Sequence, residues 1–170
     1  MRFSGVTLIA AATLGLAACG SEASGDFTTE DGEEGEYSVD YETGETNVTL
    51  DTPDGEVSMR SGSDVPIDLP AGFALMPGAT VVSNTVVDQA DGRGAMVTFT
   101  TDKGPEDIAA FYRRQAESAG IAIQIETTMN GGKMLGGENE ATGTTFSITA
   151  YPTGEDGLTM GQLTIGEERR

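Results

Sequence analysis

The stretch Gly104-Pro-Glu-Asp-Ile-Ala-Ala-Phe-Tyr-Arg-Arg-Gln-Ala-Glu-Ser-Ala-Gly120 is the segment of this chain that most clearly predicts a helix, and it decides the fold class. Pro105 falls in the first turn, where its missing N–H is tolerated, and Glu106 and Asp107 lie at the positive end of the helix dipole. The residues expected on one side of the helix follow the i, i+3, i+4 spacing: Ile108, Phe111, Tyr112, Gln115, Ala116 and Ala119. Gly120 supplies the stop, so we expect a helix over Pro105 to Ala119.

Before and after this helix in the sequence, runs in which apolar and polar residues alternate predict strands. Before it, residues 79–87 are rich in β-branched side chains, and residues 95–100 alternate after an Asp91-Gly92 turn. After it, four more runs read as strands: 121–126, 133–138, 146–150 and 158–165. Short links require antiparallel neighbours. We therefore expect an α+β domain over residues 66–168, a single antiparallel sheet of about five to six strands with one helix packed across one face.

The chain before residue 66 and after the N-terminal apolar run is acidic and has few apolar residues. From Gly20 to Pro70, fifteen acidic residues face a single base, Arg60. Residues 19–36 cannot bury enough surface to offset the entropy of ordering, so we expect a flexible acidic tether there. Residues 37–65 hold three short alternating runs separated by turn signals, and we expect weakly ordered strands or a linker. The sheet would thus be preceded by a partly disordered or weakly β tether.

The N-terminal residues combine a short apolar run, typical of an export signal, with the one cysteine of the chain. A small and apolar run, residues 6–18, is too short to span a membrane as a helix. It ends in Leu16-Ala17-Ala18-Cys19, which resembles the lipobox of bacterial lipoproteins. The resemblance implies a signal peptide over residues 1–18, cleavage between Ala18 and Cys19, and a diacylglyceryl cysteine with further acylation such as palmitate. Cys19 is the only cysteine, so no disulfide competes for it; the alternative is an ordinary small residue near a cleavage site.

Composition narrows the classes of function. A formal net charge of -19 repels nucleic acid and excludes it as a partner. Without histidine, the chain has no Ser-His-Asp or Cys-His arrangement and no zinc, copper or haem ligand set. Gly131-Gly132-Lys133 lacks the spaced glycine of a phosphate loop and fits a hairpin turn. We expect no enzyme activity, no cofactor and no metal site, although two carboxylates could still meet in space.

Three further motifs stand out: Met76-Pro-Gly-Ala79, Phe99-Thr-Thr-Asp102 with Pro105, and Ile108, Phe111-Tyr112 and Ala119-Gly120. Together they resemble a group of uncharacterised proteobacterial envelope lipoproteins, of which sphingomonad-type members are most similar. The likeness covers residues 37–165 and consists of a turn, a capped helix and a helix stop. It implies a lipobox followed by a small helix-on-sheet domain and brings no catalytic residue. The residue after Cys19 is Gly20, whereas in enterobacterial lipoproteins an aspartate at that position retains the protein at the inner membrane. Resemblance to that system therefore implies the periplasmic leaflet of the outer membrane.

Together these features favour a lipid-anchored envelope protein with a non-enzymatic interaction domain. Its partner would be another envelope protein, met through the helix-free sheet face or an exposed edge strand. Two alternatives stay open: a passive structural or surface-charge lipoprotein, and a carrier of a small apolar ligand or lipid, which needs an apolar pocket between helix and sheet. Four methionines could form an adaptable surface or fill the core: Met96, Met129, Met134 and Met160. Likewise, Tyr112 fits core packing better than an exposed contact, and Arg113-Arg114 fits the helix dipole and nearby acidic side chains better than a ligand.

Overall fold

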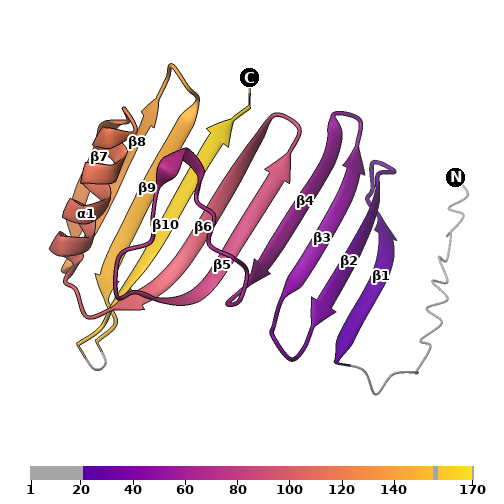
Figure 1. The fold of residues 1–170 in the computed structure, drawn as a ribbon, viewed down its shortest axis with the longest axis horizontal. Helices are drawn as coiled ribbons and strands as arrows, with labels where there is room; N and C mark the ends of the chain where they lie inside the picture. The colour runs from indigo at the N-terminus through magenta and orange to yellow at the C-terminus, as the bar shows by residue number, and fades with distance from the viewer. Residues whose placement is uncertain (1–20, 155–156, 170) are drawn as a thin grey trace, which may run out of the picture.

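The computed structural model describes residues 21–154 and 157–169 as one antiparallel sheet with a helix against part of it (Figure 1). The sheet has ten strands in the order β1-β2-β3-β4-β5-β6-β10-β9-β8-β7. Their bounds are β1 (Glu22–Thr28), β2 (Glu34–Asp40), β3 (Thr46–Thr52), β4 (Gly55–Gly62), β5 (Thr80–Gln89), β6 (Gly92–Thr101), β7 (Ala122–Met129), β8 (Gly132–Asn139), β9 (Thr144–Pro152) and β10 (Thr159–Glu168). The predicted signal peptide, its cleavage site after Ala18 and the predicted lipidation site Cys19 lie outside the described residues.

The helix α1 (Pro105–Ser118) carries the chain from β6, inside the sheet, to β7 at its edge. It begins and ends where its sequence predicts, to within one residue: Gly104 is extended at the N-cap, and Gly120 has the left-handed φ of 71° that ends a helix. Figure 1 shows α1 in front of β7, β8 and β9, and the segment with the short 3-10 helix η1 (Pro70–Gly72) in front of β6 and β10. No helix of the described residues is long and apolar enough to cross a membrane.

The prediction of a five- to six-stranded sheet preceded by a tether is wrong, because β1 to β4 continue the same sheet and bring it to ten strands. The predicted theme of one helix against one sheet face fits part of the molecule. β4 pairs with β5 over Ser58 to Gly62. The N-terminal strands, which have few apolar residues, are therefore stabilised by pairing with the edge of the C-terminal part of the sheet. The acidic segment predicted as a tether contains β1 and the start of β2.

Aromatic side chains that cover glycines help to hold β1 and β2 together. Gly25 pairs with Tyr37, and a Cβ atom at Gly25 would lie 3.0 Å from the Tyr37 ring. Gly35 pairs with Phe27, whose ring occupies the space that a Cβ atom at Gly35 would need. Such a ring shields the bare glycine backbone of the neighbouring strand from water. These pairs supply apolar contact that the composition of residues 19–36 does not reveal.

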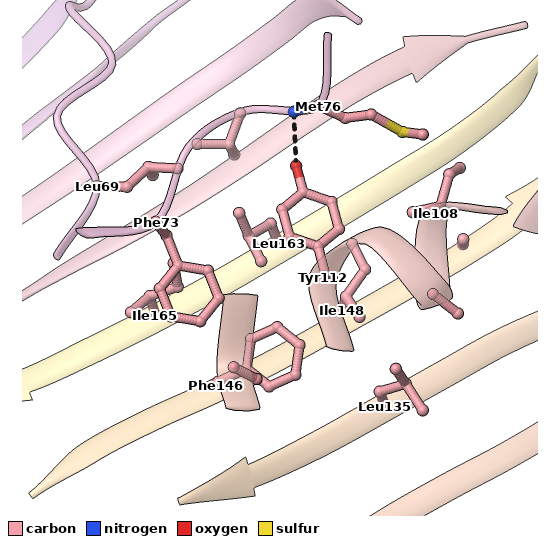
Figure 2. Packing of buried hydrophobic residues seen from close by; sticks show 14 of the residues in the cluster. Leu69, Phe73, Met76, Ile108, Tyr112, Leu135, Phe146, Ile148, Leu163 and Ile165 are labelled. Carbon is pink, nitrogen blue, oxygen red and sulfur yellow. Dashed lines mark hydrogen bonds between the residues drawn. The ribbon is translucent and has the colours of Figure 1, made fainter. Parts of the chain in front are cut away.

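The hydrophobic core lies between the sheet on one side and α1 with the η1 segment on the other (Figure 2). Phe73 of the η1 segment stacks on Phe146 of β9 with ring centroids 5.4 Å apart. The Tyr112 hydroxyl accepts a hydrogen bond of 3.2 Å from the Met76 N–H and so joins the helix to the segment. The side chains that are fully buried in this layer include Val97, Phe99, Ile108, Tyr112, Leu135, Ile148, Leu163 and Ile165.

Gly161 of β10 is expected to tolerate no side chain. A Cβ atom there would overlap the ring of Phe99, which is fully buried and cannot move aside. We expect Gly161→Ala to lower the free energy of unfolding by about 1–3 kcal/mol, measured by urea unfolding of the full chain. Gly94→Ala is the matched control, since a Cβ atom there lies 3.5 Å from its nearest neighbour, the Ile165 carbonyl oxygen. Equal losses in the two variants would contradict this packing.

Candidate functional site

The antiparallel register divides the residues of every strand between two faces of the sheet. Residues paired across neighbouring strands share a face, and Val97, Leu163 and Ile148 form one row that packs in the core. We call the face that carries this row the helix side, and the opposite face the helix-free face. Because side chains alternate along a strand, the residue on either side of a core residue belongs to the helix-free face.

The helix-free face of β6 to β10 carries the four methionines whose location the sequence left open. Met96 pairs with Thr164, Met160 pairs with Tyr151, and Met134 pairs with Thr149. Met129 and Ile125 extend the same face onto the edge strand β7. Met96 and Met134 are each 39% exposed and Met129 is 69% exposed. We name this surface the methionine face and define it by Met96, Ile125, Met129, Met134, Tyr151 and Met160.

Uncharged polar side chains lie between these apolar residues: Thr98, Thr100, Ser147, Thr149, Gln162 and Thr164. The Tyr151 hydroxyl donates to Met160 Sδ at 2.9 Å, and Gln162 Nε2 donates to Met96 Sδ at 3.5 Å. In these described strands, the charged residues of the helix-free face are Glu138 and Glu168, both near strand ends. The centre of the methionine face is therefore uncharged and only weakly polar.

The edge strand β7 ties this part of the sheet to α1 on the helix side. Arg113 Nη2 lies 2.8 Å from a Glu126 carboxylate oxygen, and Lys133 Nζ lies 3.3 Å from Glu106 and 3.8 Å from Glu126. Arg113 thus pairs with an acid of the sheet, in keeping with the interpretation that it serves nearby acids. Gln124 lies at an irregularity in the pairing with β8, and its amide donates to Glu138 at 3.0 Å. The outer edge of β7 pairs with no other strand of the described chain.

Tyr112, the other aromatic candidate, is fully buried and packs against Phe99 and Phe111 at centroid distances of 6.0 Å and 5.0 Å. It is a core residue and offers no contact to a partner. Burial disfavours the phenolate and raises the pKa of Tyr112 to about 12, while the hydrogen bond from Met76 acts in the opposite sense.

The raised pKa predicts a loss of stability in alkali. Below pH 10 the hydroxyl is neutral in both states, whereas between pH 10 and pH 12 the unfolded chain loses its proton first, so the folded state becomes less stable by about 2–3 kcal/mol. We expect the difference in urea midpoint between the native chain and Tyr112→Phe to shift in favour of the variant across this range. A difference that is independent of pH would show that Tyr112 is not buried as described.

A shallow groove lies between the η1 segment and α1. It is lined by Ala71, Gly72, Phe111, Arg114, Gln115, Ser118 and Ala119 and has a volume of about 390 Å³. Gln115 closes one side, since its Oε1 accepts from the Ala74 N–H at 2.7 Å and its Nε2 donates to the Ala74 carbonyl at 3.0 Å. The groove opens at the surface, while the layer beneath α1 is occupied by the core side chains.

Acidic side chains gather on the helix side of β1 to β4, including Asp26, Glu36, Asp51 and Glu56. Within the part of the chain that the structure describes, no group of three or more potential metal ligands is placed to hold an ion. The expectations of no metal, no cofactor and no enzyme activity stay predictions.

Comparison with known proteins gives one match. A family model described as START domain-like matches residues 81–158, a little under half of the chain. The match runs from β5 to the turn before β10 and includes α1 and four of the five strands that carry the methionine face. No curated protein and no solved structure matches the chain with significance.

Proposed function

We propose that this chain is a non-enzymatic binding protein of the bacterial envelope, held at a membrane by lipid on Cys19. Its methionine face binds another envelope protein, and the periplasmic leaflet of the outer membrane is the proposed location. The observation that carries the proposal is that Met96, Met129, Met134 and Met160 share the face of the sheet against which no described helix packs.

The chemistry of the methionine face suits a protein partner. Methionine side chains are unbranched and polarizable, so they adapt to irregular apolar surfaces. The five strands of the face span roughly 20 by 27 Å, a footprint in the range of a small protein–protein interface. The threonine and serine hydroxyls between the methionines can form hydrogen bonds at the rim, and the uncharged centre avoids burial of an unpaired charge.

Photocrosslinking in living cells tests the proposal. Photoreactive residues would be placed at Thr149 on the methionine face, at Gln124 on the β7 edge and at Arg113 on α1. We expect a single discrete adduct from Thr149, identified by mass spectrometry, and none from Arg113. An adduct from Arg113 alone would place the partner on the helix side and contradict the proposed face. The absence of adducts from all three positions would favour the passive lipoprotein.

A small-ligand carrier is the second candidate function. The START domain-like match favours a ligand-binding role, and the groove beside Phe111 and Arg114 is the surface feature nearest to α1 that could hold a small molecule. The filled core between α1 and the sheet counts against an internal apolar pocket. Native mass spectrometry of the purified chain separates the two: a co-purified small molecule that is lost in Arg114→Ala, with Arg113→Ala as control, would support the carrier.

A further inference from the structure

The four N-terminal strands segregate charge from apolar surface more completely than the rest of the sheet. Every acidic residue of β1 to β4 lies on the helix side: Glu22, Asp26, Glu34, Glu36, Asp40, Asp51 and Glu56. Arg60, the one base of these strands, lies there too because it pairs with Asn47 and Val86. The helix-free face of the same strands therefore carries no charge.

That uncharged surface is apolar, and we name it the aliphatic belt. It is made by Phe27, Tyr37, Val39, Val48, Leu50, Val57 and Met59, with Val87 of β5 beside it. Phe27 is 37% exposed and Tyr37 is 41% exposed, and the aliphatic members are half-buried by their neighbours alone. Within the described part of the chain, no helix packs on either face of β1 to β4 (Figure 1).

We propose that the aliphatic belt packs face to face against the aliphatic belt of a second copy of this chain. With β5, the belt covers five strands, roughly 20 by 25 Å. This footprint of roughly 500 Å² per copy is smaller than the ~800 Å² per partner of a standard interface and lies in the range of small, weaker interfaces. In such a pair all the acids of β1 to β4 point outward, which separates the charges of two strongly acidic copies.

The position of the anchor selects the symmetry of the pair, and this step rests on the proposed lipidation of Cys19. Ser21, whose carbonyl accepts the Tyr41 N–H at 2.7 Å, lies at one end of the strands beside the turn between β2 and β3. Its Cα atom is at most about 7 Å of extended backbone from that of Cys19. The bilayer would therefore meet this end of the strands, and the belt would run away from the membrane.

Two copies anchored in one leaflet are related by a two-fold axis along the membrane normal, which here runs along the strands. A rotation about an axis along β3 brings belt against belt with aligned strands, the geometry in which two sheets pack. It keeps both copies of Ser21 at the same end and carries the two methionine faces outward in opposite directions. A pair formed through the aliphatic belts thus leaves the methionine faces free for other partners. If a bilayer covered the belt instead, the lipid anchor would have to lie beside the face of the sheet and not at the end of its strands.

Site-directed thiol crosslinking of the full chain in vesicles tests the proposal. Acylated Cys19 has no free thiol, so introduced cysteines react alone, and the parent chain reports any reaction at Cys19. Val48→Cys and Met59→Cys place thiols on the belt, while Thr49→Cys and Ser58→Cys place them one residue away on the acidic side. With a short bismaleimide we expect several-fold more dimer from the belt positions than from their matched controls.

Equal dimer yields on the two faces, or no dimer at any position, would overturn the second copy as occupant. A fluorescent label at Val48 that is quenched by a bilayer-resident quencher without dimer formation would also overturn it, because lipid would then cover the belt. Capture of a protein at Thr149 together with no dimer at Val48 would remove only this inference. A reactive thiol at Cys19 in the parent chain would instead remove the proposed anchor and, with it, the choice of symmetry axis.

Discussion

Replacing Tyr112 with alanine is expected to lower the free energy of unfolding by about 3–5 kcal/mol, the largest loss from any single change proposed for this chain. The Tyr112 side chain is fully buried, packs against Phe99 and Phe111, and accepts the Met76 N–H. Alanine would remove the ring, leave a cavity beneath α1 and leave the Met76 N–H without its hydrogen-bond acceptor. Urea unfolding of the full chain, followed by far-ultraviolet circular dichroism, measures the loss.

The Tyr112→Phe variant distinguishes the contribution of the ring to stability from that of its hydroxyl. It keeps the packing against Phe99 and removes only the acceptor for Met76, so we expect a loss of about 1–2 kcal/mol. A third variant, Tyr151→Ala, removes an aromatic ring from the methionine face, where Tyr151 is 45% exposed, and is expected to change stability much less. A Tyr112→Ala loss no larger than that of Tyr151→Ala would contradict the assignment of Tyr112 to the core.

A negative charge on the methionine face is expected to abolish partner capture, whereas the same charge on the other face of the same strand is tolerated. Thr127 pairs with Met134 on the helix-free face, and the next residue, Thr128, pairs with Lys133 on the helix side. Both side chains are exposed in the isolated chain. Thr127→Glu would bury an unpaired carboxylate against Met134 when a partner binds, at a penalty of at least ~2 kcal/mol.

The measurement is the yield of the Thr149 adduct in cells, normalised to the amount of each variant. We expect at least a roughly tenfold loss for Thr127→Glu and less than a twofold change for Thr128→Glu, since ~2 kcal/mol corresponds to more than a factor of ten. Equal unfolding midpoints of the two variants would confirm that both are folded. Equal losses of adduct would show that the partner does not distinguish the two faces of β7.

The sequence predicts the C-terminal part of the fold because its signals are local. Pro105 and Gly120 mark the ends of α1 within the chain itself, and Asp91-Gly92 marks the β5–β6 turn. The β1 strand carries no comparable signal, since Phe27 is its only large apolar side chain. Its order depends on contacts with β2, such as Phe27 over Gly35 and Tyr37 over Gly25, which pairing alone brings together. Composition therefore indicates a tether where the structure has paired strands.

The methionine face can be predicted in part from the sequence. Met96 lies between Ala95 and Val97 in a run of alternating residues that predicts a strand. Because these two neighbours lie in the core, strand alternation places Met96 on the opposite face. The same alternation places Tyr151, which follows the core residue Ala150, on this opposite face. What alternation cannot supply is the strand order, which brings Met134 of β8 and Met160 of β10 onto neighbouring parts of one surface.

Oxidative footprinting of the native methionines tests the central claim most directly, because it needs no substitution. The full chain would be exposed to a mild oxidant in intact envelopes and, separately, after purification, and sulfoxide at each methionine measured by mass spectrometry. Met76 is only 8% exposed and serves as the protected reference, while Met96 and Met134 are each 39% exposed. We predict that Met96, Met134 and Met160 oxidise several-fold more slowly in envelopes than in the purified chain, with Met76 unchanged. Equal rates for these three methionines in the two settings would contradict a partner on the methionine face.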